Sequence, residues 1–98
     1  MTKAELIDLV AERSRLSRRD AGRAIEATLS LIEESLTGGS EVSLSGFGKF
    51  HVGLRGARAG VHPRTGEPIW VEATRVPRFT AGSGLKRAVR GPLPRARG

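Results

Sequence analysis

A basic, proline-containing segment between two predicted strands restricts the folds that this chain can adopt. Residues 55–69 read RGARAGVHPRTGEPI, with a turn signal at Pro-Arg-Thr-Gly. Pro63 and Pro68 would each remove a ladder hydrogen bond from a central strand, whereas a two-stranded ribbon has only edges and tolerates them. Such a ribbon is marginally stable in water. The segment therefore predicts a protruding arm over about residues 54–74, which adds little to a core and becomes ordered when it binds a ligand.

The rest of the chain is too small to build a large core alone. Of its 98 residues, we assign 1–90 to one domain and 91–98 to a short basic tail that is expected to be disordered. A chain of this size buries roughly two-thirds of its unfolded surface. We therefore expect a second subunit to complete the core. The chain has no cysteine and two widely separated histidines, a composition that predicts no disulfide, metal site or cofactor.

Positive charge is concentrated in the second half of the chain. Residues 1–52 carry 7 Lys or Arg and 8 Asp or Glu, whereas residues 53–98 carry 10 and 2, so the net charge of +7 arises in the second half. This asymmetry predicts a surface that binds a polyanion. No apolar run approaches the roughly 20 residues of a membrane span, and the N-terminus lacks the apolar region of a signal peptide. We expect a soluble, cytoplasmic protein.

Two helices are predicted before residue 40. Thr2 and Glu5 have the spacing of a capping box, and Ser17 is the expected N-cap of the second helix. Apolar residues recur at helical spacing in both segments, and the pair Gly38-Gly39 ends the second. The two helices should form an antiparallel hairpin.

A small antiparallel sheet should follow the helices. Residues 41–44 alternate as a short strand, and a glycine-containing turn leads into a second strand on which Phe50, Val52 and Leu54 share one face. This second strand is expected to run on into the arm. After the arm, residues 76–79 return to close a three-stranded sheet. Its aromatic residues are assigned to the core: Phe47, Phe50 and Phe79.

A short helix is expected at the end of the domain. Ser83 could cap it, with Leu85, Ala88 and Val89 facing inward and the basic residues outward. The chain is therefore predicted to have an α+β fold: a helical hairpin, a three-stranded sheet with a long arm, and a short C-terminal helix.

The order of these features resembles the bacterial histone-like HU and integration host factor family. The resemblance covers residues 1 to about 90 and is carried by two motifs. The first is Gly46-Phe47-Gly48-x-Phe50, and the second is the arm, Arg55-x-x-Arg58-x-Gly60-x-x-Pro63-x-Thr65-Gly66. Two shorter patterns follow them in the family's order, Val76-Pro77-x-Phe79 and Leu85-Lys86. Membership implies an intertwined dimer whose two ribbon arms embrace double-stranded DNA through the minor groove, bending and compacting it, as known for this group of nucleoid proteins.

The resemblance also implies roles for individual residues. Pro63 would be the wedge that enters a base step and kinks the duplex. Basic residues of the arm and flank would contact DNA, and those we assign are Lys3, Arg55, Arg58, Arg64, Arg75, Arg78, Lys86 and Arg87. The arm has no Asn or Gln suited to bidentate base reading, which favours weak sequence specificity and a preference for DNA already nicked, gapped or kinked.

The chain departs from the family pattern at several basic positions. Val61 replaces a basic residue, His62 replaces the asparagine before the tip proline, and Gly53 stands where lysine is common. Thr80 and Ser83 replace two further basic residues. Other arginines could restore the charge, so the departures affect the path of the phosphates and leave the class of ligand unchanged.

Other interpretations remain open at this point. A site-specific bender of the integration host factor type, an RNA-binding basic module and a module that adds a strand to a partner's sheet all fit part of the pattern. Trp70 could pack at the base of the arm or lie against DNA sugars. His62 is expected to be exposed. No serine has a neighbouring base or oxyanion site, so no enzyme is predicted. The dimer could contain two identical chains or a paralogue.

Overall fold

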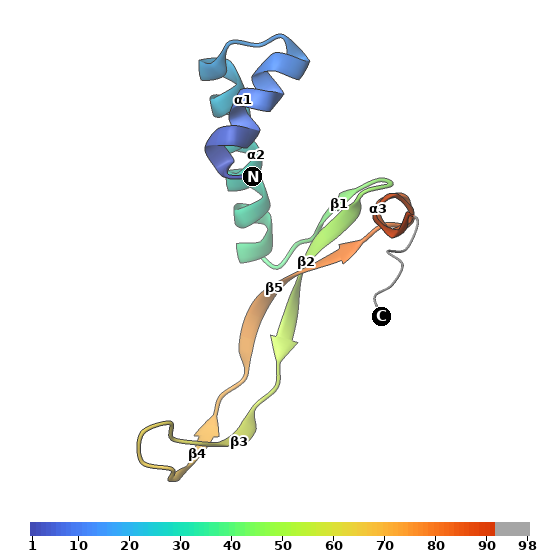
Figure 1. Ribbon diagram of the computed structural model, residues 1–98. Coiled ribbons are helices and arrows are strands. Elements are labelled where there is room, and N and C mark those ends of the chain that lie inside the picture. The colour runs from blue at the N-terminus through green and yellow to red at the C-terminus, as the bar shows by residue number, and fades with distance from the viewer. Residues whose placement is uncertain (92–98) are drawn as a thin grey trace, which may run out of the picture.

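The computed structural model describes residues 1–91, which form two helices, a sheet with a long ribbon, and a third helix (Figure 1). The elements in chain order are α1 (Lys3–Ser14), α2 (Arg18–Thr37), β1 (Val42–Leu44), β2 (Gly48–Arg55), β3 (Arg58–Val61), β4 (Pro68–Val71), β5 (Thr74–Ala81) and α3 (Ser83–Arg90). This order confirms the predicted α+β fold. Apart from Gly91, the predicted tail lies outside the described residues.

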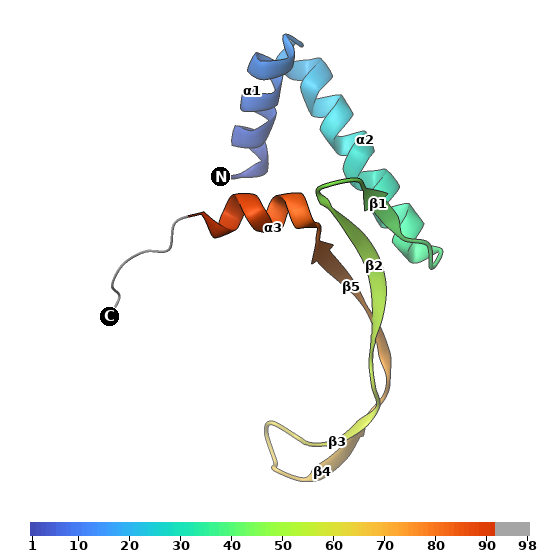
Figure 2. The ribbon, with the colours of Figure 1, turned by 90° about the vertical axis from the view of Figure 1, so that its right-hand side faces the viewer.

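The helix starts follow the predicted caps. Thr2 Oγ1 accepts from the Glu5 N–H at 3.2 Å, and Glu5 Oε1 accepts from the Thr2 N–H at 2.7 Å, which completes the capping box. Ser17 Oγ accepts from the Asp20 N–H at 3.0 Å. The helices diverge from their turn as an open V (Figure 2), and Ile7 and Ala21 are buried between them.

The strands form two ladders and not one continuous ribbon. The sheet has the order β1-β2-β5, and β2 and β5 pair from Gly48 and Ala81 to Arg55 and Thr74. The distal pair β3–β4 is a separate two-stranded sheet. The prediction that the second strand runs unbroken into the arm is therefore wrong. Residues 56–57 and 72–73 interrupt both strands, and the arm curves at this level (Figure 2).

Glycine permits a close approach of chain segments where the sheet meets α3. A Cβ on Gly48 would lie 2.5 Å from the ring of Phe79 and 2.6 Å from the Thr80 carbonyl oxygen. Gly82 occupies the N-cap position, and its N–H donates to the Phe47 carbonyl at 2.8 Å. The prediction that Ser83 caps this helix is wrong, because Gly82 passes so close to the Phe47 backbone that the helix begins directly after it and Ser83 becomes its first residue.

The protomer has almost no core of its own. Within residues 1–91, Ile7 and Ala21 are the buried apolar residues, whereas Phe79 is 41% exposed and Val89 76% exposed. The radius of gyration is 19.3 Å, against about 13 Å for a compact chain of this length. The assignment of the phenylalanines to a core is not met within the protomer: the rings of Phe50 and Phe79 lie 4.8 Å apart, but Phe47 and Phe79 are exposed and Phe50 is half-buried.

The inward orientation predicted for one face of α3 is not found in the protomer. Ala88 and Val89 are exposed and Leu85 is half-buried, because α3 extends away from the sheet and finds no element to cover it (Figure 2). The accessible surface is 8026 Å², whereas a folded monomer of this mass exposes about 5,400 Å². Part of this excess belongs to the arm, and part is apolar surface on the body.

Candidate nucleic-acid interface

The arm ends in a turn that is held by hydrogen bonds on both sides of Pro63. The Gly66 N–H donates to the His62 carbonyl at 2.8 Å, and the His62 N–H donates to the Glu67 carbonyl at 2.8 Å. Gly66 has a φ of 76°, a left-handed conformation that glycine adopts without steric cost. Pro63 therefore lies exposed at the outermost turn of the arm.

The His62 side chain also stabilises this turn. Its Nδ1 accepts from the backbone N–H of Arg64 at 3.0 Å and from that of Thr65 at 3.3 Å. An asparagine oxygen makes the same kind of local bond in an Asx turn. His62 is exposed as predicted, but its turn-stabilising role was missed. The signal was its place directly before the tip proline, where a short-range acceptor is favoured.

Two exposed apolar side chains share one face of the distal ribbon. Trp70 lies opposite Ala59 and is 62% exposed, and Val61, two residues along β3, is 63% exposed. The proposal that Trp70 packs at the base of the arm is wrong, since β4 belongs to the distal ladder. The cause is the break at residues 72–73, which separates Trp70 from the sheet.

The proximal ribbon, formed by β2 and β5, has one apolar and one polar face. Directly paired residues point to the same side of an antiparallel sheet, so Phe50 and Val52 share a face with their partners Phe79 and Pro77. We call the opposite side the polar face. It carries Lys49, His51, Gly53 and Arg55 on β2, and Thr74, Val76, Arg78 and Thr80 on β5.

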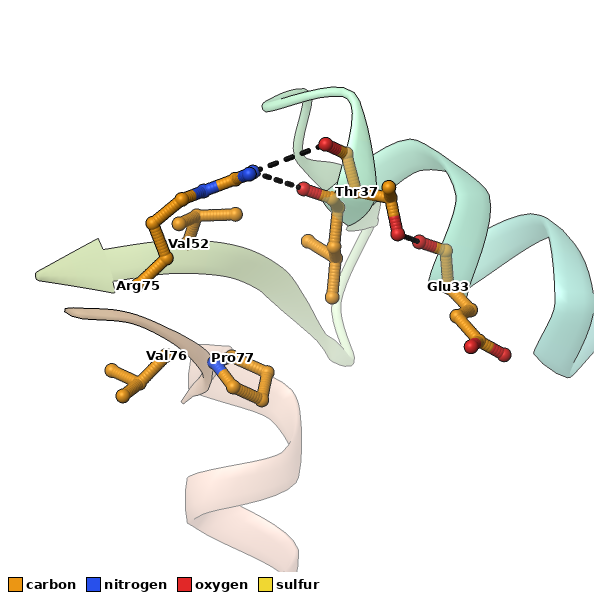
Figure 3. A pocket seen from close by; sticks show the side chains of 7 residues that line it. Glu33, Thr37, Val52, Arg75, Val76 and Pro77 are labelled. Atoms are coloured by element: carbon orange, nitrogen blue, oxygen red, sulfur yellow. Dashed lines mark hydrogen bonds between the residues drawn. The ribbon is translucent and has the colours of Figure 1, made fainter.

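Arg75 ties the base of the arm to the end of α2. Its Nη2 donates to the carbonyl oxygens of Leu36 at 2.9 Å and Thr37 at 3.2 Å (Figure 3). The same carbonyl groups lie at the negative end of the helix dipole, which attracts a cation. Val52 and Pro77 lie beside this contact in a shallow apolar groove (Figure 3). The assignment of Arg75 to DNA contact stays a prediction, and its guanidinium already has carbonyl partners within the fold.

Apart from Arg78 on the polar face, the remaining predicted contact residues lie in three places along the molecule. Three are exposed along the ribbon and its tip: Arg55, Arg58 and Arg64. Lys86 and Arg87 are exposed on α3. Lys3 lies on α1, where its Nζ is 2.7 Å from Glu26 Oε2 on α2. This exposed ion pair neutralises part of the charge that Lys3 could offer a ligand.

Two other kinds of site are not found in the described part of the chain. Residues 1–91 contain no group of three or more His, Cys, Asp or Glu side chains placed to hold a metal ion. None of the three helices in this range is long and apolar enough to span a membrane.

Known proteins with similar sequences are DNA-binding proteins. The family model described as bacterial DNA-binding protein matches residues 1–90. The chain is 49% identical over 90 residues to the DNA-binding protein HU-1 of Halalkalibacterium halodurans, covering 92% of this chain and all of that protein. It is 47% identical over 90 residues to HU-alpha of Vibrio cholerae, with the same coverage.

Solved structures show the same fold. An Anabaena HU–DNA cocrystal structure has 40% identity and a TM-score of 0.90, covering 94% of this chain and 100% of that chain. The HU of Thermotoga maritima has 30% identity and a TM-score of 0.66, covering 91% and 98%. Because the family model and these relatives cover nearly the whole described chain, the protein belongs to the bacterial DNA-binding protein family, the histone-like HU group that its arm motifs resemble.

Proposed function

We infer that this protein is an architectural protein that binds double-stranded DNA with little sequence specificity. The observation that carries this inference is the arm: a basic ribbon that ends in a hydrogen-bonded turn with an exposed proline. The family assignment and the backbone similarity to an HU structure in complex with DNA support it. Domain 1–90 would carry this function, and we propose no catalytic activity and a place in the bacterial nucleoid.

The working unit is proposed to be a dimer. Apolar side chains are exposed on α1 and α2, among the aromatic residues and on α3, and a folded protein rarely leaves so much apolar surface uncovered. Obligate dimers bury 2,000–5,000 Å² in total, or about 1,000–2,500 Å² per subunit, and the excess surface of one protomer is large enough to supply such an interface. Two arms, one from each subunit, would then hold one duplex. The partner is an identical chain or a paralogue.

Binding would be driven by phosphate neutralisation. Arg55, Arg58 and Arg64 place positive charge along the whole arm, and Lys86 and Arg87 extend it onto α3. Each neutralised phosphate releases condensed counterions, so log K should fall with log salt by about 0.9 per contact. Lys3 would join this set once DNA competes for it with Glu26, and Arg78 would add a cation on the polar face.

Pro63 would concentrate the bend at one base step. Its ring is apolar, has no N–H that needs a partner, and loses little conformational freedom when it is inserted. Bending a short duplex smoothly costs on the order of 1–6 kcal/mol, and unstacking one step localises this cost. DNA that is already nicked, gapped or kinked should therefore bind more tightly than intact DNA.

The test is a salt-titrated gel shift of one short duplex, intact and with a central nick, together with a bend measurement by end-to-end energy transfer. Wild-type protein should prefer the nicked duplex and show a steep salt slope on both. Pro63→Ala should reduce the bend more than the affinity, because the arm keeps its charges. Equal binding to both duplexes, or an unchanged bend in the variant, would contradict the wedge. Tighter binding to an RNA hairpin than to any DNA would contradict the DNA function itself.

A further inference from the structure

On the polar face of the proximal ribbon, the paired residues His51 and Arg78 have different neighbours. Residues at diagonal positions of two paired strands lie within reach of each other on the same face. His51 Nε2 lies 2.8 Å from Thr80 Oγ1 along one such diagonal. Arg78, which is paired with His51, extends toward the other end of the ribbon along a parallel diagonal, to Gly53.

The Arg78 side chain fills the space in which residue 53 would carry a side chain. A Cβ built on Gly53 would overlap Arg78 Nε and would lie 2.5 Å from its Cδ and 3.1 Å from its Cζ. The next glycine along the chain, Gly56, has no atom within 4 Å of the corresponding point. The contact is therefore particular to Gly53, and it lays the guanidinium across the sheet surface.

We propose that Gly53 and Arg78 act as a cross-strand pair that orients the Arg78 guanidinium as a preorganised phosphate contact on the polar face. This inference rests on the proposed DNA-binding function and assigns the contact to a specific geometry. Lys49 and Arg55 lie on the same face at the two ends of β2, so Arg78 supplies the cation between them. An arginine whose stem is held against a surface loses less rotamer freedom on binding than an extended one.

Glycine at position 53 has no other evident purpose in the fold. It lies inside a strand, where glycine costs roughly 0.5–1 kcal/mol relative to alanine, and its φ is not in the left-handed region. A side chain there would meet the flexible end of Arg78 and not a backbone atom. Gly53→Ala should therefore displace Arg78 without damage to the fold.

The experiment is a double-mutant cycle on the full-length protein, with DNA affinity measured from 50 to 200 mM salt and thermal stability measured in parallel. The variants are G53A, R78A, G53A/R78A and R78A/G53K. The control is G38A, because Gly38 is the C-cap of α2 and lies in neither strand of the polar face, and a Cβ there would lie at an ordinary 3.6 Å from the Glu34 carbonyl.

R78A should reduce the salt slope by about 0.9 per protomer. A dimer would lose two such contacts. The ratio of wild-type to R78A affinity should therefore fall by about 12-fold between 50 and 200 mM salt. G53A should weaken binding in the same direction with an unchanged or higher melting temperature, and should have no further effect in the R78A background. R78A/G53K should recover most of the slope, because the lysine rises from the place where the guanidinium lay. G38A should leave the slope unchanged.

Three results would overturn the inference. They are an unchanged slope in R78A, a G53A effect of equal size with and without Arg78, and a loss of melting temperature in G53A that explains its weaker binding. If wild-type protein binds with a steep slope and R78A matches it, only this inference fails. If wild-type protein itself shows no salt slope, the proposed DNA function fails as well.

Discussion

Replacement of Arg75 by methionine should destabilise the fold and leave the salt dependence of DNA binding unchanged. The change keeps an apolar stem beside Val52 and Pro77 but removes the donors to the Leu36 and Thr37 carbonyls. Hydrogen bonds from charged groups contribute about 1.5–3 kcal/mol when buried, and a cation at a helix C-terminus 0.3–1 kcal/mol. Because Arg75 is exposed, water and salt reduce this to about 1 kcal/mol per protomer.

A dimer would therefore lose about 2 kcal/mol, which corresponds to a fall in melting temperature of about 4–8 °C for a protein of this size. Calorimetry at a fixed protein concentration measures the stability, and a salt-titrated gel shift of the same sample measures the slope. R78A is the opposite control, with an unchanged melting temperature and a reduced slope. If Arg75→Met instead reduced the slope by about 0.9 per protomer at an unchanged melting temperature, Arg75 would be a DNA contact and the cap interpretation would be wrong.

Three further predictions concern other parts of the molecule. His62→Ala should reduce DNA bending, measured by energy transfer, because the Nδ1 atom that orders the tip turn is removed. His62→Asn should retain the bend, since the asparagine oxygen can accept the same backbone bonds. The free energy of unfolding should change by less than about 0.5 kcal/mol in both variants. Gly48→Ala should destabilise the fold by about 2–4 kcal/mol in urea unfolding, because the new Cβ meets Phe79 and the Thr80 carbonyl at a φ of 156°. Glu26→Gln should tighten DNA binding in the gel shift, because it releases Lys3 and removes a negative charge, whereas unchanged affinity would exclude Lys3 from the interface.

Local patterns predicted the elements of this fold well. The capping residues Thr2 and Ser17 begin both helices, and the alternation from Phe50 to Leu54 identifies the apolar face of β2. These features depend on neighbours in the chain, either through a hydrogen bond within one helical turn or through the two-residue period of a strand. The proline-containing arm was recognised for the same reason, since Pro63 and Pro68 exclude a central strand.

Errors occurred where contacts are made between segments distant in the sequence. Ser83 has the chemistry of a cap, yet Gly82 takes that position because the chain passes the Phe47 backbone there. Val89 belongs to a predicted apolar face, but the protomer offers nothing to cover it. A helical or alternating pattern identifies a face that can be buried, and it does not identify the surface that buries it.

The sequence by itself determined the class of fold, the basic arm with its tip proline, and the family, because short-range hydrogen bonds, side-chain periodicity and charge balance are all readable along one chain. Only the tertiary structure decided which neighbours each arginine contacts within the fold. Arg75 and Arg78 are three residues apart on β5 and chemically identical. The pairing register turns Arg75 to the end of α2 and lays Arg78 over Gly53, because successive residues of a strand point to opposite faces and the neighbours on each face come from elsewhere in the chain.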